Sequence, residues 1–334
     1  MTFHTRLFLI SSLLFCSLIG RSAIAEEWNV GFKSLQVSDP VFHDNIEVAV
    51  WYPTRAKAQD ESIGPLTLHL AVGAEMPASS KGLILISHGF SGNAFGHNDT
   101  AQHLASLGFV VASPTHPDLQ GLKSGKPKLD PLVARPRQIQ LVIDELLKHP
   151  SFKKSLRPNR IGIIGFSLGT YTALATIGAK ADLSGLASYC AINSKDFLLC
   201  SPQARHRLSA IAPDLIPQHD NRISAAVLLA PAYGPLFSYE SLSTVKIPIQ
   251  LFAAEQDTEL DNQYNALHFE ENLPNGTSLE MIKDAGHFVF LAPCPEKLKR
   301  AVPFLCEDNE SVDRVAIHQK LNRDIAGFFN KALN

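Results

Sequence analysis

The pentapeptide Gly165-Phe166-Ser167-Leu168-Gly169, near the middle of the chain, most constrains what this sequence can fold into. It overlaps the end of an apolar run, IGIIG at 161–165, and directly precedes a helical segment rich in small residues. Glycines two residues either side of a serine suit a strained strand-to-helix turn, because the backbones can then approach without clashes. G-x-S-x-G also occurs by chance, but a strand before it and a helix after it predict that Ser167 is a nucleophile.

Continuous apolar runs alternate with segments of helical period over most of the chain. The runs lie at 83–87, 109–113, 161–165, 225–230 and 247–253, with a last strand expected at 278–282. Helices are expected at about 97–107, 131–148, 168–179, 260–272 and 311–332. Strands that are buried on both faces belong to parallel sheets, so the pattern predicts an α/β fold with a mostly parallel central sheet and helices on both faces. The run Glu47–Pro53 alternates instead, which predicts a half-exposed antiparallel strand.

Residues 180–224 do not fit this alternation. The segment is long, contains two cysteines and several apolar residues, and follows the helix that begins after Ser167. An insertion at this point would lie above the carboxyl edge of the sheet, so we expect a small cap. The apolar cluster around Phe197 and Leu199 should then form one wall of the substrate pocket. The alternative is an ordinary long connection whose apolar residues complete the core away from the site.

A serine nucleophile needs a base and a group that orients the base. His287 follows the expected last strand, in a loop from which its imidazole could reach the sheet edge. Asp257 lies between Ser167 and His287, in the loop just past the strand expected at 247–253. The sequence therefore predicts Ser167, His287 and Asp257 as nucleophile, base and acid.

Other residues remain as rivals for these roles. His103 and His116 precede the nucleophile, and His268 falls within an expected helix, where a packing or surface role is favoured. Glu255 is very close to the end of its strand. Asp261 has the position of an early helical residue, where the helix dipole stabilises a carboxylate.

The sequence His88-Gly89-Phe90-Ser91-Gly92 follows the strand expected at 83–87. Such a turn directs a backbone N–H toward a developing oxyanion, so the amides of Phe90 and Leu168 are the predicted donors. A plain glycine turn is the alternative. The chain contains no H-E-x-x-H, Walker or G-x-G-x-x-G motif, and we expect neither a metal nor a cofactor.

With the G-x-S-x-G motif, His287, Asp257 and the His88-Gly89 turn, the chain resembles the α/β-hydrolase superfamily from about residue 45 to 330. Within it, the motifs at 87–92, 165–174 and 286–288 are similar to those of the predicted dienelactone hydrolases, the group related to plasma-type platelet-activating-factor acetylhydrolase. The resemblance implies an α/β-hydrolase fold. The chain departs from the group at Ser167, where true dienelactone hydrolases have cysteine. Phe166 and Thr170 also replace a histidine and a glycine that are usual in the acetylhydrolases.

The N-terminus has the pattern of an exported protein. His4 and Arg6 precede an apolar run at residues 7–19, which is shorter than the roughly 20 residues that span a bilayer. Small residues at Ala23 and Ala25 then mark a cleavage site. We expect a signal peptide over 1–25, cleaved near Ala25, and a single mature domain over 26–334 that is periplasmic or secreted. A buried N-terminal helix or an uncleaved anchor is the alternative.

Cleavage would remove Cys16 and leave four cysteines, an even number that indicates disulfides in an exported chain. Four cysteines allow three pairings, and the spacing favours the local pairs Cys190–Cys200 and Cys294–Cys306. A zinc site is the less favoured alternative, because the chain has no C-x-x-C spacing and no neighbouring pair of histidines.

The charge is nearly balanced, with 30 Lys+Arg against 32 Asp+Glu, and no basic run exceeds Lys153-Lys154. A nucleic-acid partner is therefore not expected, since such proteins show a basic stripe. Together the motifs predict an exported serine hydrolase that cleaves a small-molecule or lipid carboxylic ester through an acyl-enzyme and has no stable membrane span. A lipid esterase of the acetylhydrolase type, or a hydrolase-fold binding protein without catalysis, are the alternatives.

Overall fold

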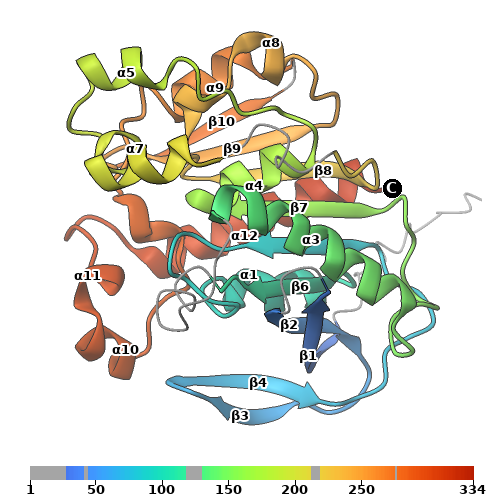
Figure 1. The fold of residues 1–334 in the computed structure, drawn as a ribbon. Helices are drawn as coiled ribbons and strands as arrows, with labels where there is room; N and C mark the ends of the chain where they lie inside the picture. Colours follow the sequence, from blue (N-terminus) through green and yellow to red (C-terminus); the bar gives the residue numbers. More distant parts are fainter. Residues whose placement is uncertain (1–27, 41–43, 118–129, 212–218, 275–276) are drawn as a thin grey trace, which may run out of the picture.

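The computed structural model of the chain describes residues 28–40, 44–117, 130–211, 219–274 and 277–334. Within these residues the strands form a ten-stranded sheet in the order β10-β9-β8-β7-β5-β6-β2-β1-β4-β3 (Figure 1). The strands are β1 (Asn29–Asp39), β2 (Asp44–Thr54), β3 (Gln59–Ile63), β4 (Leu66–Val72), β5 (Leu83–Ser87), β6 (Val110–Thr115), β7 (Ile161–Phe166), β8 (Ile223–Leu229), β9 (Ile249–Ala254) and β10 (Ser278–Ile282). Neighbours from β10 to β6 are parallel, whereas β2 is antiparallel to both β6 and β1.

Helices cover both faces of the sheet (Figure 1). The main ones are α1 (Asn98–Ser106), α3 (Pro131–Lys148), α4 (Leu168–Thr176), α9 (Ala266–Asn272) and α12 (Arg314–Ala332). Shorter elements are α5 (Leu186–Ile192), α6 (Phe197–Cys200), α7 (Pro202–Ser209), α8 (Tyr239–Leu242), α10 (Glu296–Ala301), α11 (Pro303–Cys306) and the 3-10 turns η2 (Gly234–Leu236) and η3 (His287–Phe290). Helix α3 contacts α4, and α1 contacts α12. The predicted fold class, a mostly parallel α/β sheet between helices, is confirmed.

The central strands are buried along their whole length, as their apolar sequences predicted. Every residue of β5 and β7 is buried, and the two strands pair in parallel from Leu83 opposite Ile161 to Ser87 opposite Gly165. Helix α4 is also buried at every position, which explains its small residues. The ends of β5 and β7 therefore place His88 and Ser167 side by side at the carboxyl edge of the sheet, where ligands bind in open α/β folds.

Two local expectations were wrong. Strand β2 is antiparallel, as predicted, but it is buried continuously from Val48 to Thr54 rather than half-exposed, because β1, β6 and helix α1 contact it. The helix expected at 260–272 begins only at Ala266. The Asp261 carboxylate accepts a hydrogen bond from the Gln263 amide at 2.9 Å, which is a turn geometry that competes with helix formation.

Helix α3 begins at Pro131 and ends at Lys148, as predicted. Its N-cap, Asp130, accepts a hydrogen bond from the Leu132 amide at 2.9 Å, and proline suits the first helical position because its missing N–H would have no partner there. The helix buries one side against β6 and α4. This orientation carries Arg135 into the interior.

Both local cysteine pairs are disulfides, as the spacing predicted. The Cα atoms are 5.2 Å apart in Cys190–Cys200 and 5.7 Å apart in Cys294–Cys306. The first bond joins α5 to α6, and the second joins the segment before α10 to the end of α11. The predicted signal peptide lies outside the described residues. Among the residues that are described, no helix is both long and apolar enough to cross a membrane.

The helices of segment 180–224 lie beside loops at the carboxyl edge of the sheet. The Tyr189 ring contacts Tyr264, past β9, with centroids 5.4 Å apart. The Asp182 amide donates to the Leu236 carbonyl, past β8, at 2.7 Å. Arg207 on α7 forms an ion pair with Asp130, the N-cap of α3, at 2.9 Å. Three separate loops thus hold this segment.

Candidate active site

Ser167 occupies the turn between β7 and α4 in a backbone conformation that L-residues rarely adopt. Its φ is 51° and its ψ is −118°. The Ser167 amide donates to the Leu229 carbonyl at 3.0 Å, and its carbonyl accepts from the Thr170 amide at 2.8 Å, so both backbone groups are fixed. Strain of this kind persists only where the surroundings enforce it, and it is common at functional sites.

The two glycines of the motif are required by close backbone approach. A Cβ on Gly165 would collide with the carbonyl of Gly169, and a Cβ on Gly169 would collide with the carbonyl of Ser87. Helix α4 therefore lies directly against β5 and β7. This packing explains the spacing of the motif in this chain.

His287 and Asp257 meet at the same edge of the sheet. His287 is the first residue of η3, and its Nδ1 lies 2.7 Å from the Asp257 Oδ2. Both side chains are buried, at 6% and 2% exposed. The Asp257 Oδ1 accepts from the amides of Glu259 and Leu260, each at 2.9 Å, so the carboxylate is held from both sides.

Phe166 connects this pair to the elbow. Its ring lies 5.1 Å from the His287 ring, and the next residue in the chain is Ser167. The structure thus places all three predicted triad residues around the end of β7. Their catalytic roles stay a proposal.

The rival residues have other partners. Glu255 accepts from the Asp284 amide at 2.9 Å, and Asp261 forms the turn before α9. The His268 Nε2 lies 2.8 Å from the Phe237 carbonyl within the packing of α9. His116 is buried in a hydrogen-bond network beside β5.

The loop after β5 carries the predicted oxyanion donor Phe90. The other predicted donor, Leu168, is the first residue of α4, where an amide has no partner within the helix. The Gly89 position is close to the elbow, since a Cβ there would lie 3.4 Å from the Ser167 Cβ. The two amides thus belong to neighbouring segments on either side of Ser167.

A buried arginine fixes the path of this loop. Arg135, on α3, has no solvent exposure. Its guanidinium donates from Nη1 to the His88 carbonyl at 2.5 Å and from Nη2 to the Gly89 carbonyl at 3.0 Å. Two adjacent carbonyls that point at Arg135 fix the orientation of the peptide groups leading to Phe90. Sequence reasoning missed Arg135, because a charged residue within a helical period is usually at the surface.

Two neutral imidazoles complete the support of the loop. Burial, followed by the charge of Arg135, lowers the pKa of both His88 and His116 well below the usual range. The His88 Nδ1 lies 2.6 Å from the Gly89 carbonyl, and its Nε2 accepts from the His116 amide at 2.9 Å. His116 lies between Ser87 and Gln138, at 3.0 and 2.6 Å. Because its ring nitrogens are both occupied, His116 has a supporting role.

We expect Arg135→Met to lower kcat by about 100-fold, the loss typical of a missing oxyanion donor, because the Phe90 amide would no longer be held in place. The variant also leaves two buried carbonyls without their charged donor, which costs about 1–3 kcal/mol of stability. Steady-state kinetics and thermal unfolding measure the two effects. Arg137→Met is the matched control: it lies two residues along α3, pairs with Asp39 and should leave kcat unchanged. Equal kinetics of the two variants would contradict this role for Arg135.

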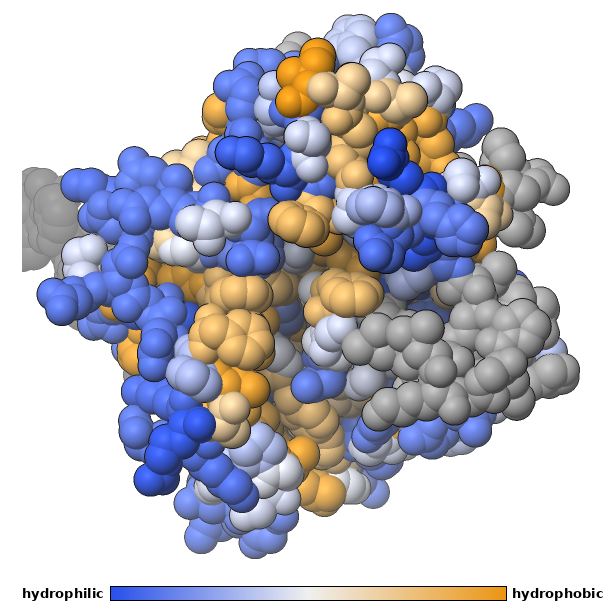
Figure 2. Space-filling view, turned by 60° about the vertical axis from the view of Figure 1, so that its left-hand side comes forward, coloured by the Kyte–Doolittle hydropathy of each residue, from blue (hydrophilic) through white to orange (hydrophobic). Residues whose placement is uncertain are grey.

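Apolar side chains form a band between hydrophilic regions on the face that carries α5, α7, α10 and α11 (Figure 2). Phe90 is 55% exposed and Phe304 is 65% exposed. The Phe304 ring lies 6.0 Å from Phe288, which itself contacts the His287 ring. An exposed aromatic ring, Phe304, is thus connected to the buried His287–Asp257 pair through Phe288.

The two predicted pocket residues have different surroundings. Phe197, on α6, is 83% exposed, so it does not pack inside the molecule as the sequence suggested. Leu199 is 1% exposed and belongs to the core. Neither lines the hollow of about 700 Å³ between α5 and α7, whose walls include Leu186, Cys190 and Leu208. No group of three metal-ligating side chains occurs among the described residues.

Comparisons with known proteins support the fold. No family model and no curated protein matches the sequence. A solved structure, the ferulic acid esterase from Streptomyces cinnamoneus, matches with a TM-score of 0.63 and 17% identity. The match covers 93% of this chain and 92% of that one. The chain therefore has the α/β-hydrolase fold over nearly its whole length.

Proposed function

We propose that this protein is a serine hydrolase that cleaves carboxylic esters through an acyl-enzyme. The observation that carries the proposal is the buried His287–Asp257 pair, at 2.7 Å, beside a serine on a strained strand-to-helix turn. Ion pairs and histidines are common in proteins. Their meeting beside such a turn, at the carboxyl edge of this fold, is the arrangement that nucleophilic catalysis requires.

In the acylation step, the Ser167 Oγ forms a bond to the ester carbonyl carbon while its proton passes to the His287 Nε2. The carbonyl π electrons move onto oxygen, where the amides of Phe90 and Leu168 stabilise the negative charge. Collapse of the intermediate expels the alkoxide, which takes the proton from His287 and leaves as the alcohol. Water then repeats the sequence on the acyl-enzyme and releases the acid. Asp257 holds the Nδ1 proton throughout, so that Nε2 is free to accept.

The substrate that the surroundings favour is an ester with an apolar or aromatic acyl group. Phe288 contacts the His287 ring, Phe304 contacts Phe288, and Phe90 is an exposed ring in the loop after β5. The structural neighbour is an esterase of ferulic acid, an aromatic acyl group, so esters of hydroxycinnamic acids belong in a substrate panel. Short-chain p-nitrophenyl esters and an acetylated phospholipid complete it, and the phospholipid arm tests the lipid-esterase alternative.

A fluorophosphonate probe tests the nucleophile directly. The purified protein should be labelled at one serine, and peptide mapping should identify that residue as Ser167. Turnover of at least one ester in the panel should be lost in proportion to labelling. A protein that is neither labelled nor active on any ester would instead be a hydrolase-fold binding protein.

We also propose that the chain is exported and that a signal peptide is removed near Ala25. Two disulfides support this proposal, since such bonds persist in oxidising compartments. The partners that we propose, a small-molecule or lipid ester and no nucleic acid, rest instead on the motifs and on the balanced charge. Mass spectrometry of the N-terminus of the mature protein tests the cleavage, and an N-terminus at Met1 would contradict it.

Segment 180–224 is proposed as a cap that forms one wall of the acyl pocket. Phe197→Ala should then shift the preferred acyl chain length at little cost in stability, because the side chain is 83% exposed. Leu199→Ala should mainly destabilise the fold, by about 2–5 kcal/mol, because it leaves a cavity in the core. Kinetics over a series of acyl lengths and thermal melts separate the two effects. Ile192→Ala, at an equally exposed cap position, is the control, and an unchanged chain-length profile in Phe197→Ala would refute the proposed wall.

A further inference from the structure

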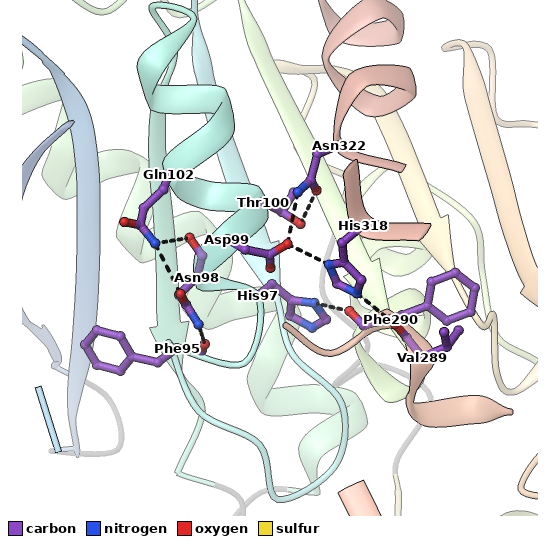
Figure 3. Close-up of polar contacts among 10 residues, drawn as sticks. All are labelled: Phe95, His97, Asn98, Asp99, Thr100, Gln102, Val289, Phe290, His318 and Asn322. Carbon is purple, nitrogen blue, oxygen red and sulfur yellow. Dashed lines mark hydrogen bonds and ion pairs between the residues drawn. The ribbon is translucent and has the colours of Figure 1, made fainter. Parts of the chain in front are cut away.

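A buried polar cluster lies between α1 and α12, next to the turn that carries His287. His318 and Asn322 on α12 point toward Asp99 and Thr100 on α1, and the backbone of Val289 and Phe290 lies beside them (Figure 3). The proposed triad uses none of these side chains. The cluster is nevertheless bonded to η3, the turn that begins at His287.

His318 bridges α1 and η3. Its Nδ1 lies 2.6 Å from the Asp99 Oδ2, and its Nε2 lies 2.7 Å from the Val289 carbonyl. Both partners are acceptors, so both ring nitrogens carry a proton and the ring is an imidazolium. Burial alone would lower the pKa of His318, but the hydrogen bond and charge of Asp99 outweigh it and raise this pKa above its ordinary value.

Asp99 is the counter-ion of this ring. Burial tends to raise its pKa, but the hydrogen bonds and charge of His318, with the Asn322 amide, reverse the effect and hold the pKa low. The Asn322 Nδ2 donates to the Asp99 Oδ2 at 2.9 Å, and the Thr100 hydroxyl donates to the Asn322 Oδ1 at 2.7 Å. The carboxylate is thus oriented as well as charged.

A second imidazole holds the next carbonyl of the turn. The His97 Nδ1 lies 3.0 Å from the Phe290 carbonyl, and burial lowers the pKa of His97 to about 4. The ring is therefore neutral. Its Nε2 has no hydrogen-bond partner among the described residues, which puts the proton on Nδ1. The His97 ring also packs on Phe166, 5.2 Å away, and so contacts the elbow residue before Ser167.

We propose that His318 is a positioning residue: as an imidazolium held by Asp99, it fixes the turn η3 and with it the orientation of His287. The carbonyls of two consecutive residues of this turn, Val289 and Phe290, accept from His318 and His97. Each carbonyl lies two or three residues from His287. The inference rests on the proposed function only in taking His287 as the base.

A consequence of this arrangement is an alkaline limit to the site. When His318 loses a proton it keeps a single N–H, which can serve Asp99 or Val289 but not both. Because the folded-state pKa is raised, the stabilisation is complete below the unfolded value of about 6.5 and is lost as pH rises through the higher folded value. The other charged or titratable groups that act on the ring are His97 and Arg314, which pairs with Asp308. His103 lies one turn beyond Asp99 on α1.

The decisive variant is Asp99→Asn, which keeps the shape and one acceptor but removes the charge. The carbonyl oxygen of the substituted side chain would still accept from His318 Nδ1, so the neutral ring would present an unprotonated Nε2 to the Val289 carbonyl. We expect kcat to fall by about 10- to 100-fold, as for a small displacement of a catalytic group, with little change in KM. The alkaline limb of the kcat profile should move to lower pH. Asp324→Asn, on α12 and paired with Lys320 at the surface, is the matched control and should change neither.

Two measurements on the full chain do not depend on ester turnover. Nitrogen NMR of the histidine rings should show His318 protonated at both nitrogens at neutral pH in the unaltered protein. Hydrogen exchange at the Val289 and Leu291 amides, which bond within the turn, should be faster in Asp99→Asn. If the variant is too unstable to measure, the unaltered protein can be titrated through the alkaline range instead. Both the ring protonation of His318 and the exchange of the two amides can then be followed as His318 loses its proton.

The outcomes separate the two proposals. A protein without ester turnover or probe labelling refutes the proposed function, and the ring and exchange measurements then decide the role of His318. If the protein is active, a His318 ring that carries a single proton at neutral pH refutes the inference. An Asp99→Asn variant that has a lower melting temperature but unchanged kcat and an unchanged pH profile also refutes the inference.

Discussion

Ser167→Ala is expected to abolish ester turnover, with a loss of about 10⁶-fold in kcat, as when the nucleophile of a triad is removed. Without the hydroxyl no acyl-enzyme forms, and the probe has nothing to label. The fold should be unaffected, because serine and alanine both carry a Cβ and pay the same cost for a φ of 51°. Circular dichroism and thermal melts check this.

Ser167→Gly provides a control that alanine cannot. This variant also lacks the hydroxyl and should be inactive. Because glycine adopts positive φ without strain, its free energy of unfolding should exceed that of Ser167→Ala by up to about 1 kcal/mol, and it should melt at a higher temperature. The order of the two melting temperatures tests whether the elbow is strained. Nearly normal turnover in either variant, or probe labelling at another residue, would mean that Ser167 is not the nucleophile, whereas a small residual rate is expected from the oxyanion hole and binding alone.

Asp257→Asn should lower kcat by about 10⁴-fold, as when a triad aspartate is neutralised. The surroundings of Asp257 explain why asparagine cannot substitute. The Oδ1 atom accepts from two backbone amides, so the asparagine oxygen must take that position and its NH₂ group must face His287. The imidazole would then accept at Nδ1 and carry its proton on Nε2, which is the tautomer that cannot accept the Ser167 proton.

Glu255→Gln is the matched control for this variant. Glu255 lies two residues earlier in the same loop, and its carboxylate accepts from the Asp284 amide rather than from His287. It should retain nearly normal kcat. If Glu255→Gln were the inactive variant and Asp257→Asn the active one, the acid would be Glu255.

The core of the fold was predictable because strands that are buried on both faces consist mainly of apolar residues. Strand β5 begins and ends where its apolar run does, and helix α3 has the predicted bounds. The G-x-S-x-G elbow was predictable for a similar reason, since its two glycines are demanded by backbone contacts that no other residue tolerates. The His287–Asp257 contact followed from strand ends meeting at one edge.

The supporting residues were not predictable from local pattern. Arg135 donates to carbonyls 47 and 46 positions earlier in the chain, and His318 to Asp99 across 219 positions. A charged residue on a helix has the same local signature whether it faces water or a buried carbonyl. The burial of strand β2 was predicted wrongly because an alternating sequence does not reveal that helix α1 contacts the strand. Contacts between distant segments decide these cases.

The bond between His318 and Val289 also leads us to expect an order of assembly. Helix α12 (Arg314–Ala332) follows the turn that carries His287 along the chain, so the turn is synthesised before the helix that supports it. Joining it to α1 closes a loop of more than two hundred residues, a contact that forms late because its entropy must be offset by structure already present. We therefore expect an emerging chain to complete its sheet and elbow before α12 docks, and the proposed hydrolytic chemistry to begin only after that docking.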